Sequence, residues 1–159
     1  MSITQAVRLE QSKGLAGQEG DLQASNNVSK VNTTEAVIPF GYPVHRDGVD
    51  GVKMVSTATT EADIVGVAVR AFNDVTIGEA GINAHRTGTI KTMGTIWVTA
   101  GEAVKANDPV HAGVGATVAG KFMKQAGSDG TKAIKMTGWK FLTDAQANET
   151  VLISIQIGG

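Results

Sequence analysis

The chain has 159 residues, of which 42% are hydrophobic, 4% are aromatic and none is cysteine. A chain of this length suits one domain, which can bury roughly 70% of its unfolded surface, and the lack of cysteine excludes disulfides, thiolate metal ligands and thiol nucleophiles. The 14 Lys and Arg residues nearly balance the 15 Asp and Glu residues, so the formal net charge is −1 and there is no single-sign field to attract nucleic acid or an anionic membrane.

Residues 1–33 are predicted to form an extended N-terminal arm that precedes a body over residues 34–159. They contain no aromatic residue and no Pro, and Gly14, Gly17 and Gly20 interrupt them. Two interpretations stay open, a loosely ordered terminus or an arm that becomes ordered against a partner. The apolar residues available for such a contact are Val7, Leu9, Leu15, Leu22, Val28 and Val31. The arm lacks the apolar run of a signal peptide, and no later segment has the length of a membrane span, so we expect a protein made and kept in a cytoplasm.

From Glu35 onward short strands and turns are predicted to alternate. Turns are expected where Asp-Gly and Asn-Asp-Pro sequences supply side-chain hydrogen bonds or positive φ angles. The predicted strands are 36–38, 43–45, 52–55, 65–71, 87–92, 95–99, 109–112, 117–123, 133–142 and 150–157. This pattern predicts an all-β fold, either a small antiparallel β-barrel or a jelly-roll-like sandwich.

The last predicted strand shows the clearest alternation, because Ser154 and Gln156 fall between branched residues. Side chains alternate between the two faces of a strand, so we expect one buried face and one wet face. The residues predicted to line the core by this parity argument are Ile38, Val65, Val67, Val69, Ile96, Val98, Val151, Ile153, Ile155 and Ile157.

Three motifs suggest chemistry, but each lacks a residue that the chemistry needs. The segment 115–122 has the glycine and lysine spacing of a phosphate-binding loop, but Phe122 replaces the hydroxyl residue that would bind magnesium, so a hairpin is favoured. The three histidines, His45, His85 and His111, do not have the spacing of a metal site. The segment 45–51 lacks the regular ladder of a calcium loop and is predicted to be a tight turn. We therefore expect no cofactor, no metal and no catalytic residue.

Six segments, in this order, resemble the capsid decoration proteins, or cement proteins, of tailed bacteriophages. They are 36–44 (AVIPFGYPV), 65–70 (VGVAVR), 94–98 (GTIWV), 102–111 (EAVKANDPVH), 137–141 (TGWKF) and 151–155 (VLISI). One departure from the family pattern is Asn107, where Gly is common, but Asn also tolerates left-handed backbone geometry. The run 75–86 does not align with the pattern.

The resemblance implies a β-barrel or jelly-roll-like body on the exterior of an assembled capsid. It implies a structural virion protein that bridges subunits of the major capsid protein and stabilises the shell, after synthesis in the host bacterial cytoplasm. The arm residues given above would then contact the capsid or a neighbouring subunit. A homo-oligomer is expected, with a trimer favoured and a dimer also compatible with capsid symmetry.

Two other functions are weighed against a cement protein. A β-sandwich adhesion or carbohydrate-binding module would use Tyr42, Trp97 and Trp139 as stacking platforms, whereas a structural protein would place these rings in its core. A small barrel enzyme is disfavoured because no set of nucleophile, acid, base and oxyanion donors can be assembled from the sequence.

Overall fold

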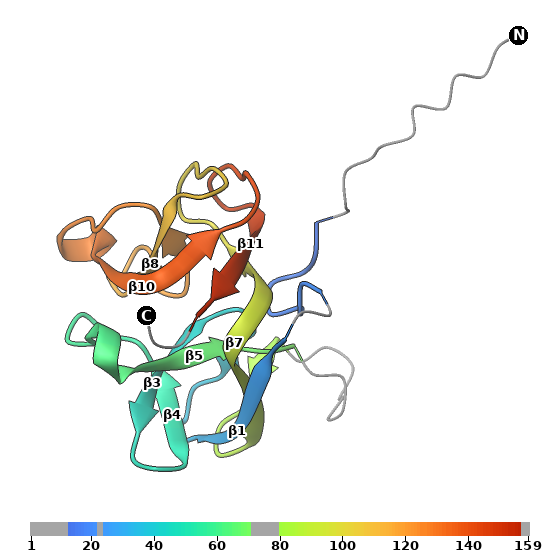
Figure 1. The fold of residues 1–159 in the computed structure, drawn as a ribbon. Helices are drawn as coiled ribbons and strands as arrows, with labels where there is room; N and C mark the ends of the chain where they lie inside the picture. Colours follow the sequence, from blue (N-terminus) through green and yellow to red (C-terminus); the bar gives the residue numbers. More distant parts are fainter. Residues whose placement is uncertain (1–12, 22–23, 71–79, 157–159) are drawn as a thin grey trace, which may run out of the picture.

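The computed structural model describes residues 13–21, 24–70 and 80–156, and in these the chain is almost entirely β-structure (Figure 1). The strands are β1 (Asn26–Asn32), β2 (Ile38–Pro39), β3 (Pro43–Asp47), β4 (Gly51–Met54), β5 (Ile64–Ala68), β6 (Gly81–Ile82), β7 (Thr87–Thr99), β8 (Pro109–Gly113), β9 (Phe122–Met123), β10 (Ala133–Phe141) and β11 (Thr150–Ile155). The helical structure is limited to two 3-10 turns, η1 (Glu61–Asp63) and η2 (Asp129–Thr131). Among the described residues, therefore, no helix is long enough to cross a membrane.

Five strands close into a small barrel, which confirms the predicted fold class. The strands follow one another in the order β1-β4-β3-β5-β7, and β7 pairs again with β1, so the ring has no free edge. The barrel encloses a cluster of apolar side chains that come from six segments of the chain: Ile38, Val44, Val52, Ala68, Ile82 and Ile90. Their burial removes the apolar surface of this half of the protein from water.

The second half of the sheet continues from the same long strand, β7. The strands β11, β10, β8 and β9 follow in order beyond β7, and a single bridge between Ala100 and Phe122 brings the far end back to the end of β7. We call this half the second lobe; it lies beside the closed barrel, and β7 runs through both (Figure 1). The core of the second lobe includes Phe122 and Trp139, whose rings stack with centroids 6.4 Å apart.

β7 is one strand where the sequence predicted two, 87–92 and 95–99. Its first part pairs with β1 and β5, and its last part, from Gly94 to Thr99, pairs with β11. The change of partners occurs at Gly94, which has a φ of +118° and whose absent side chain leaves room for Ser25. The glycine between the two predicted strands is therefore a bend within one long strand, which belongs to both lobes.

The parity argument for the core is confirmed for most of its residues. Eight of the predicted core residues are buried: Ile38, Val67, Val69, Ile96, Val98, Val151, Ile153 and Ile155. Val65 is only partly buried and packs against the barrel cluster, and Ile157 lies outside the described residues. Asn107 has a φ of +73°, the left-handed geometry that the sequence expects at this turn.

Other strands differ from the prediction, and among them the short strand β6 was not predicted. The segment 117–123 is a strand only at Phe122–Met123, because residues 117–121 form the turn between β8 and β9. The strand β1 was not predicted, although it lies within the stretch assigned to the arm. The alternation of apolar and polar residues in β1 is hidden, because the buried residue is Asn32. The side-chain amide of Asn32 donates hydrogen bonds to the carbonyls of Ala36 and Ile82 at 2.7 and 3.0 Å. Residues 26–32 therefore belong to the closed barrel.

Candidate functional site

Residues 13–21, which we call the strap, lie along the second half of β7 on the side that β11 leaves free. The amide of Gly17 donates to the carbonyl of Trp97 at 2.7 Å, and the amide of Trp97 donates to the carbonyl of Gln18 at 2.8 Å. The amide of Gly20 donates to Thr95 at 3.1 Å. The strap thus adds a short strand-like segment to the sheet and covers part of its outer surface.

The glycines of the strap permit its close approach to the sheet. A Cβ atom at Gly14 would lie 2.4 Å from the Trp97 ring, and one at Gly20 would lie 2.5 Å from a methyl group of Leu152. Trp97 and Leu152 are directly paired across β7 and β11, on the face opposite to the core, and they are only 4% and 7% exposed. The expectation that this face of the last strand is wet is therefore wrong at Leu152, because the strap covers it.

A charged pair fastens the strap to the barrel. The ammonium of Lys91 lies 2.8 Å from a carboxylate oxygen of Glu19, and the Lys91 side chain is 2% exposed while that of Glu19 is 47% exposed. The side-chain amide of Asn27 donates to the same oxygen of Glu19 at 2.8 Å. These two contacts, with Asn27 the larger cause, lower the pKa of Glu19. The strap is thus held by a charge-assisted contact at a buried cation.

Arg70 holds the middle of the strap. Its Nε donates to the carbonyl of Ala16 at 3.2 Å, and its backbone amide donates to the carbonyl of Gly17 at 2.7 Å. Its guanidinium also lies 5.0 Å above the centre of the Phe40 ring, within the range of a cation–π contact. Two described parts of the predicted arm, the strap and β1, therefore make specific contacts with the body.

The three predicted contact residues of the arm that the structure describes, Leu15, Val28 and Val31, lie in different environments. Leu15 projects from the strap and is 61% exposed, whereas Val28 and Val31 are partly buried in β1. Val28 packs against the barrel cluster, so it contributes to the fold. Val7, Leu9 and Leu22 lie outside the described residues. Of the described residues in the predicted set, Leu15 is thus the most exposed, and Val28 also lines the groove described below.

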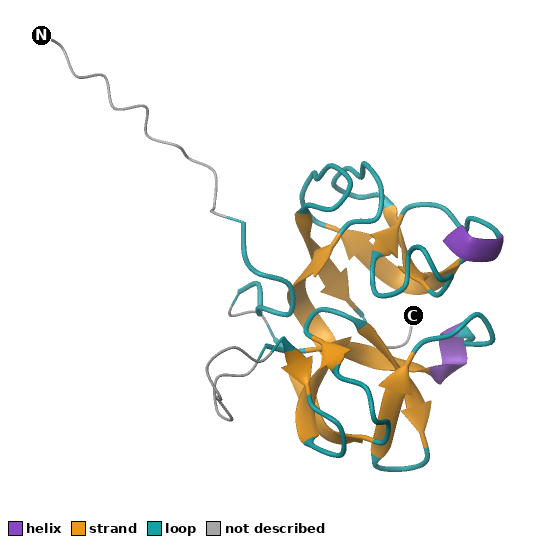
Figure 2. Cartoon of the chain, turned by 180° about the vertical axis from the view of Figure 1, so that it is seen from behind, coloured by secondary structure: helices purple, strands orange, loops and turns teal. Residues whose placement is uncertain are grey.

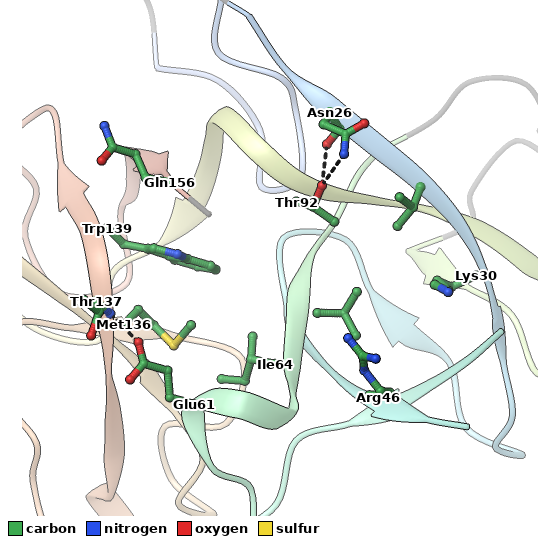
Figure 3. A pocket seen from close by; sticks show the side chains of 12 residues that line it. Asn26, Lys30, Arg46, Glu61, Ile64, Thr92, Met136, Thr137, Trp139 and Gln156 are labelled. Atoms are coloured by element: carbon green, nitrogen blue, oxygen red, sulfur yellow. Dashed lines mark hydrogen bonds between the residues drawn. The ribbon is translucent and has the colours of Figure 1, made fainter. Parts of the chain in front are cut away.

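The structure also provides a groove of about 610 Å³ between the closed barrel and the second lobe (Figure 3). The barrel contributes residues of β1, β3, β5 and β7 together with η1, and the second lobe contributes β10 and Gln156. The lobes are tied together beside it, because the amide of Thr137 donates to Glu61 at 2.6 Å and Lys132 donates to the carbonyl of Thr57 at 2.8 Å. The turns η1 and η2 lie on the same side of the molecule (Figure 2). Sequence reasoning did not find this groove, because its residues are scattered along the chain.

The segments with possible phosphate or metal chemistry have structural roles. The amides of Gly115, Val118 and Lys121 donate to backbone carbonyls at 2.9, 3.1 and 2.9 Å, so they are already used within the connection of β8 and β9. These two strands pair antiparallel, as the predicted hairpin requires. In the segment 45–51, Asp47 accepts from the hydroxyl of Thr33 at 2.6 Å and from Lys53 at 3.2 Å, and these contacts lower its pKa.

The three histidines lie apart. His45 contacts the hydroxyl of Thr59 at 2.9 Å, and His85 contacts Glu35 at 2.9 Å. His111 is buried on β8, where the loss of hydration lowers its pKa. No group of three or more metal-ligating side chains occurs within the described ranges.

These features describe a small all-β protein whose N-terminal segment is anchored along the sheet. The model of the structural cement protein family (E217 gp24/Pam3 gp6) matches residues 3–156, and the chain belongs to this family of phage structural proteins. The predicted resemblance is thus confirmed.

A solved structure of a phage capsid chain shows the same fold. A chain of the capsid of Myoviridae phage XM1 is 24% identical and superimposes with a TM-score of 0.72, with 98% of each chain covered. The N base of the head fiber gp8.5 of bacteriophage phi29 is 14% identical over 82% of this chain and 95% of that one, with a TM-score of 0.38, which is too low to support an argument. No curated protein matches the sequence.

Proposed function

We propose that this protein is a cement protein that binds the outer surface of an assembled phage capsid, bridges neighbouring major capsid subunits and stabilises the shell. The observation that carries the proposal is the family match over residues 3–156. The fold shared with a chain of a phage capsid is consistent with it. The protein would be made in the host bacterial cytoplasm and would reside on the capsid exterior as a homo-oligomer, with a trimer favoured and a dimer also compatible with capsid symmetry.

The strap supplies a physical basis for bridging. It is fastened to the body by the Lys91–Glu19 contact and by the hydrogen bonds to β7. The residues before it, including Val7 and Leu9, would reach a neighbouring capsid subunit, and Leu15 would add an apolar contact beside the body. Two linked contacts bind more tightly than either alone, because the second contact forms at a high effective concentration.

A binding comparison tests this function. Purified protein is mixed with assembled capsids or with dispersed capsid subunits, and the bound fraction is measured by sedimentation for the capsids and by size-exclusion chromatography for the subunits. A site that spans two neighbouring subunits exists only in the shell, so we expect binding to capsids and little binding to dispersed subunits. Equal affinity for both forms, or no binding to capsids, would contradict the proposal.

The burial of the aromatic rings argues against the carbohydrate-binding alternative. Trp97 and Trp139 are only 4% and 7% exposed, and Tyr42 packs partly buried against the barrel cluster. Sugar platforms require an open aromatic face, which neither Trp97 nor Trp139 offers; only the small exposed part of Trp139 borders the groove. A glycan array without hits would exclude this function directly.

A further inference from the structure

β10, which lines the groove between the lobes, has an irregular register in its middle. β10 pairs with β8 at residues 133–135 and at Lys140, with a register shift between, and it pairs with β11 only at Lys140 and Phe141. Gly138 lies in the unpaired part with a φ of +81°. Met136, Thr137 and Trp139 in this irregular stretch form one wall of the groove.

The floor of the groove is apolar. Met136 and Trp139 approach from β10, and Ile64 approaches from β5, so that their side chains point into the same space (Figure 3). Val28 and Val65, both partly buried, extend this surface along the barrel side. The volume of about 610 Å³ is in the range of pockets that hold several side chains or a small ligand.

The groove also carries a cation, Arg46, whose charge has only a small effect within the fold: the pKa of Asp63 is lowered mainly by hydrogen bonds with Thr60, and the attraction of Arg46 adds to this. Arg46 lines the barrel side, is exposed, and makes no hydrogen bond or ion pair within the described part of the chain. The other two charged lining groups are engaged, because Lys30 donates to the carbonyl of Val49 at 2.6 Å and Glu61 accepts from the amide of Thr137 at 2.6 Å. Since a guanidinium binds a carboxylate through paired hydrogen bonds, Arg46 is suited to an acidic side chain of a partner.

We infer that this groove binds an extended segment of a major capsid subunit that carries an acidic side chain for Arg46 and an apolar side chain for the floor formed by Met136, Trp139 and Ile64. The inference rests on the proposed function and adds a second contact to that of the strap. The apolar side chain would supply buried area and the carboxylate would fix the register of the segment.

The test uses the full-length protein and assembled capsids in a co-sedimentation titration. Arg46→Glu reverses the charge in the groove, and Arg86→Glu is its matched control, because Arg86 is exposed on the turn before β7 and does not line the groove. Gln156→Trp places a bulky side chain in the groove, and Gln146→Trp is its control at an exposed position outside it. All four positions are exposed, so we expect the variants to melt like the wild type.

We expect Arg46→Glu and Gln156→Trp each to weaken capsid binding by about 10-fold or more, and the two controls to change it less than about 2-fold. If the wild type binds capsids and both groove variants bind as well as their controls, the inference is wrong while the proposed function stands. If the groove variants change the oligomeric state in light scattering but not capsid binding, the occupant is a second copy and the inference is also wrong. If the wild type does not bind capsids, the proposed function fails and the inference with it.

Discussion

The pair of Lys91 and Glu19 gives a prediction in which the two partners are not equivalent. The variant Glu19→Gln leaves the ammonium of Lys91 in a site where its side chain is 2% exposed, whereas Lys91→Met leaves a carboxylate whose side chain is 47% exposed. An unpaired buried charge is costly, but a half-exposed one is hydrated by water. Removal of the more exposed partner should therefore be the more damaging change.

The exposed fractions of the two side chains also set the size of the expected loss in the free energy of unfolding. Breaking a fully buried ion pair from one side costs about 3–5 kcal/mol. Because water reaches Glu19, we expect Glu19→Gln to lower the free energy of unfolding by about 1–3 kcal/mol. Methionine keeps the apolar stem of Lys91 in place, so Lys91→Met should cost less than about 1 kcal/mol. The double variant should cost no more than Glu19→Gln alone, since the two residues act on one interaction.

Urea unfolding at pH 7 measures these differences. The control is Lys13→Met, which removes the cation of the pair with Glu149, whose side chains are 50% and 46% exposed, and should leave the midpoint unchanged. If Lys91→Met destabilises the protein as much as Glu19→Gln or more, the reasoning about the buried cation is wrong.

The pair of Lys91 and Glu19 also predicts that the stability of the folded protein depends on pH. The pKa of Glu19 is lowered in the folded protein, by Asn27 first and then by Lys91, so the folded state binds fewer protons than the unfolded state between the two pKa values. The stabilisation by Glu19 is thus complete above its unfolded pKa, about 4.3, and is lost as the pH falls through the lower folded value. The difference between the wild type and Glu19→Gln should narrow from pH 7 to pH 3, and a constant difference would contradict this assignment.

Three further predictions concern the core and the capsid contact. Ile153→Ala, at a fully buried position, should cost about 2–4 kcal/mol in urea unfolding through lost burial and a cavity, whereas Gln156→Ala should cost less than about 0.5 kcal/mol; equal losses would show that the faces of β11 are wrongly assigned. Removal of residues 1–12 takes away none of the contacts described above, so it should leave the melting temperature unchanged but weaken capsid binding by ~100-fold. Removal of residues 1–33 also takes away the strap and β1 and should unfold the protein. A stable chain without residues 1–33 would contradict the structural role of β1. With a formal net charge of −1, capsid binding should survive a change from about 50 to 500 mM salt, and complete release would reveal a charge patch that this account lacks.

The strands that could be predicted from the sequence are those with strict alternation. The segments around Val67 and Ile153 place apolar residues on one parity, so their buried faces follow from local pattern alone. β1 was missed because one of its inward positions is Asn32, whose side-chain amide is satisfied by the nearby carbonyl group of Ala36 and by that of Ile82, which is far away in the sequence. Such a partner cannot be recognised from neighbouring residues.

The contact surfaces were less predictable than the strands. The glycines at 14 and 20 resemble a flexible linker, and their close contacts with Trp97 and Leu152 depend on residues far away in the sequence. The groove combines residues of several elements around Arg46 and Trp139, so no local motif could indicate it. Leu15 could be proposed as a contact residue because an apolar residue in a polar, glycine-rich stretch is visible in the sequence, and that contact stays a prediction.

The central claim, that the protein stabilises an assembled shell, is tested most directly by the heat stability of capsids. Capsids that lack the protein are melted alone, with saturating wild-type protein, and with saturating protein that lacks residues 1–12, and occupancy is measured in parallel by sedimentation. We expect the wild type to raise the temperature at which the shell dissociates, because a ligand bound only to the assembled state stabilises that state, and we expect the shortened protein to raise it less. A dissociation temperature that stays the same while the wild-type protein fully occupies the shell would contradict the account.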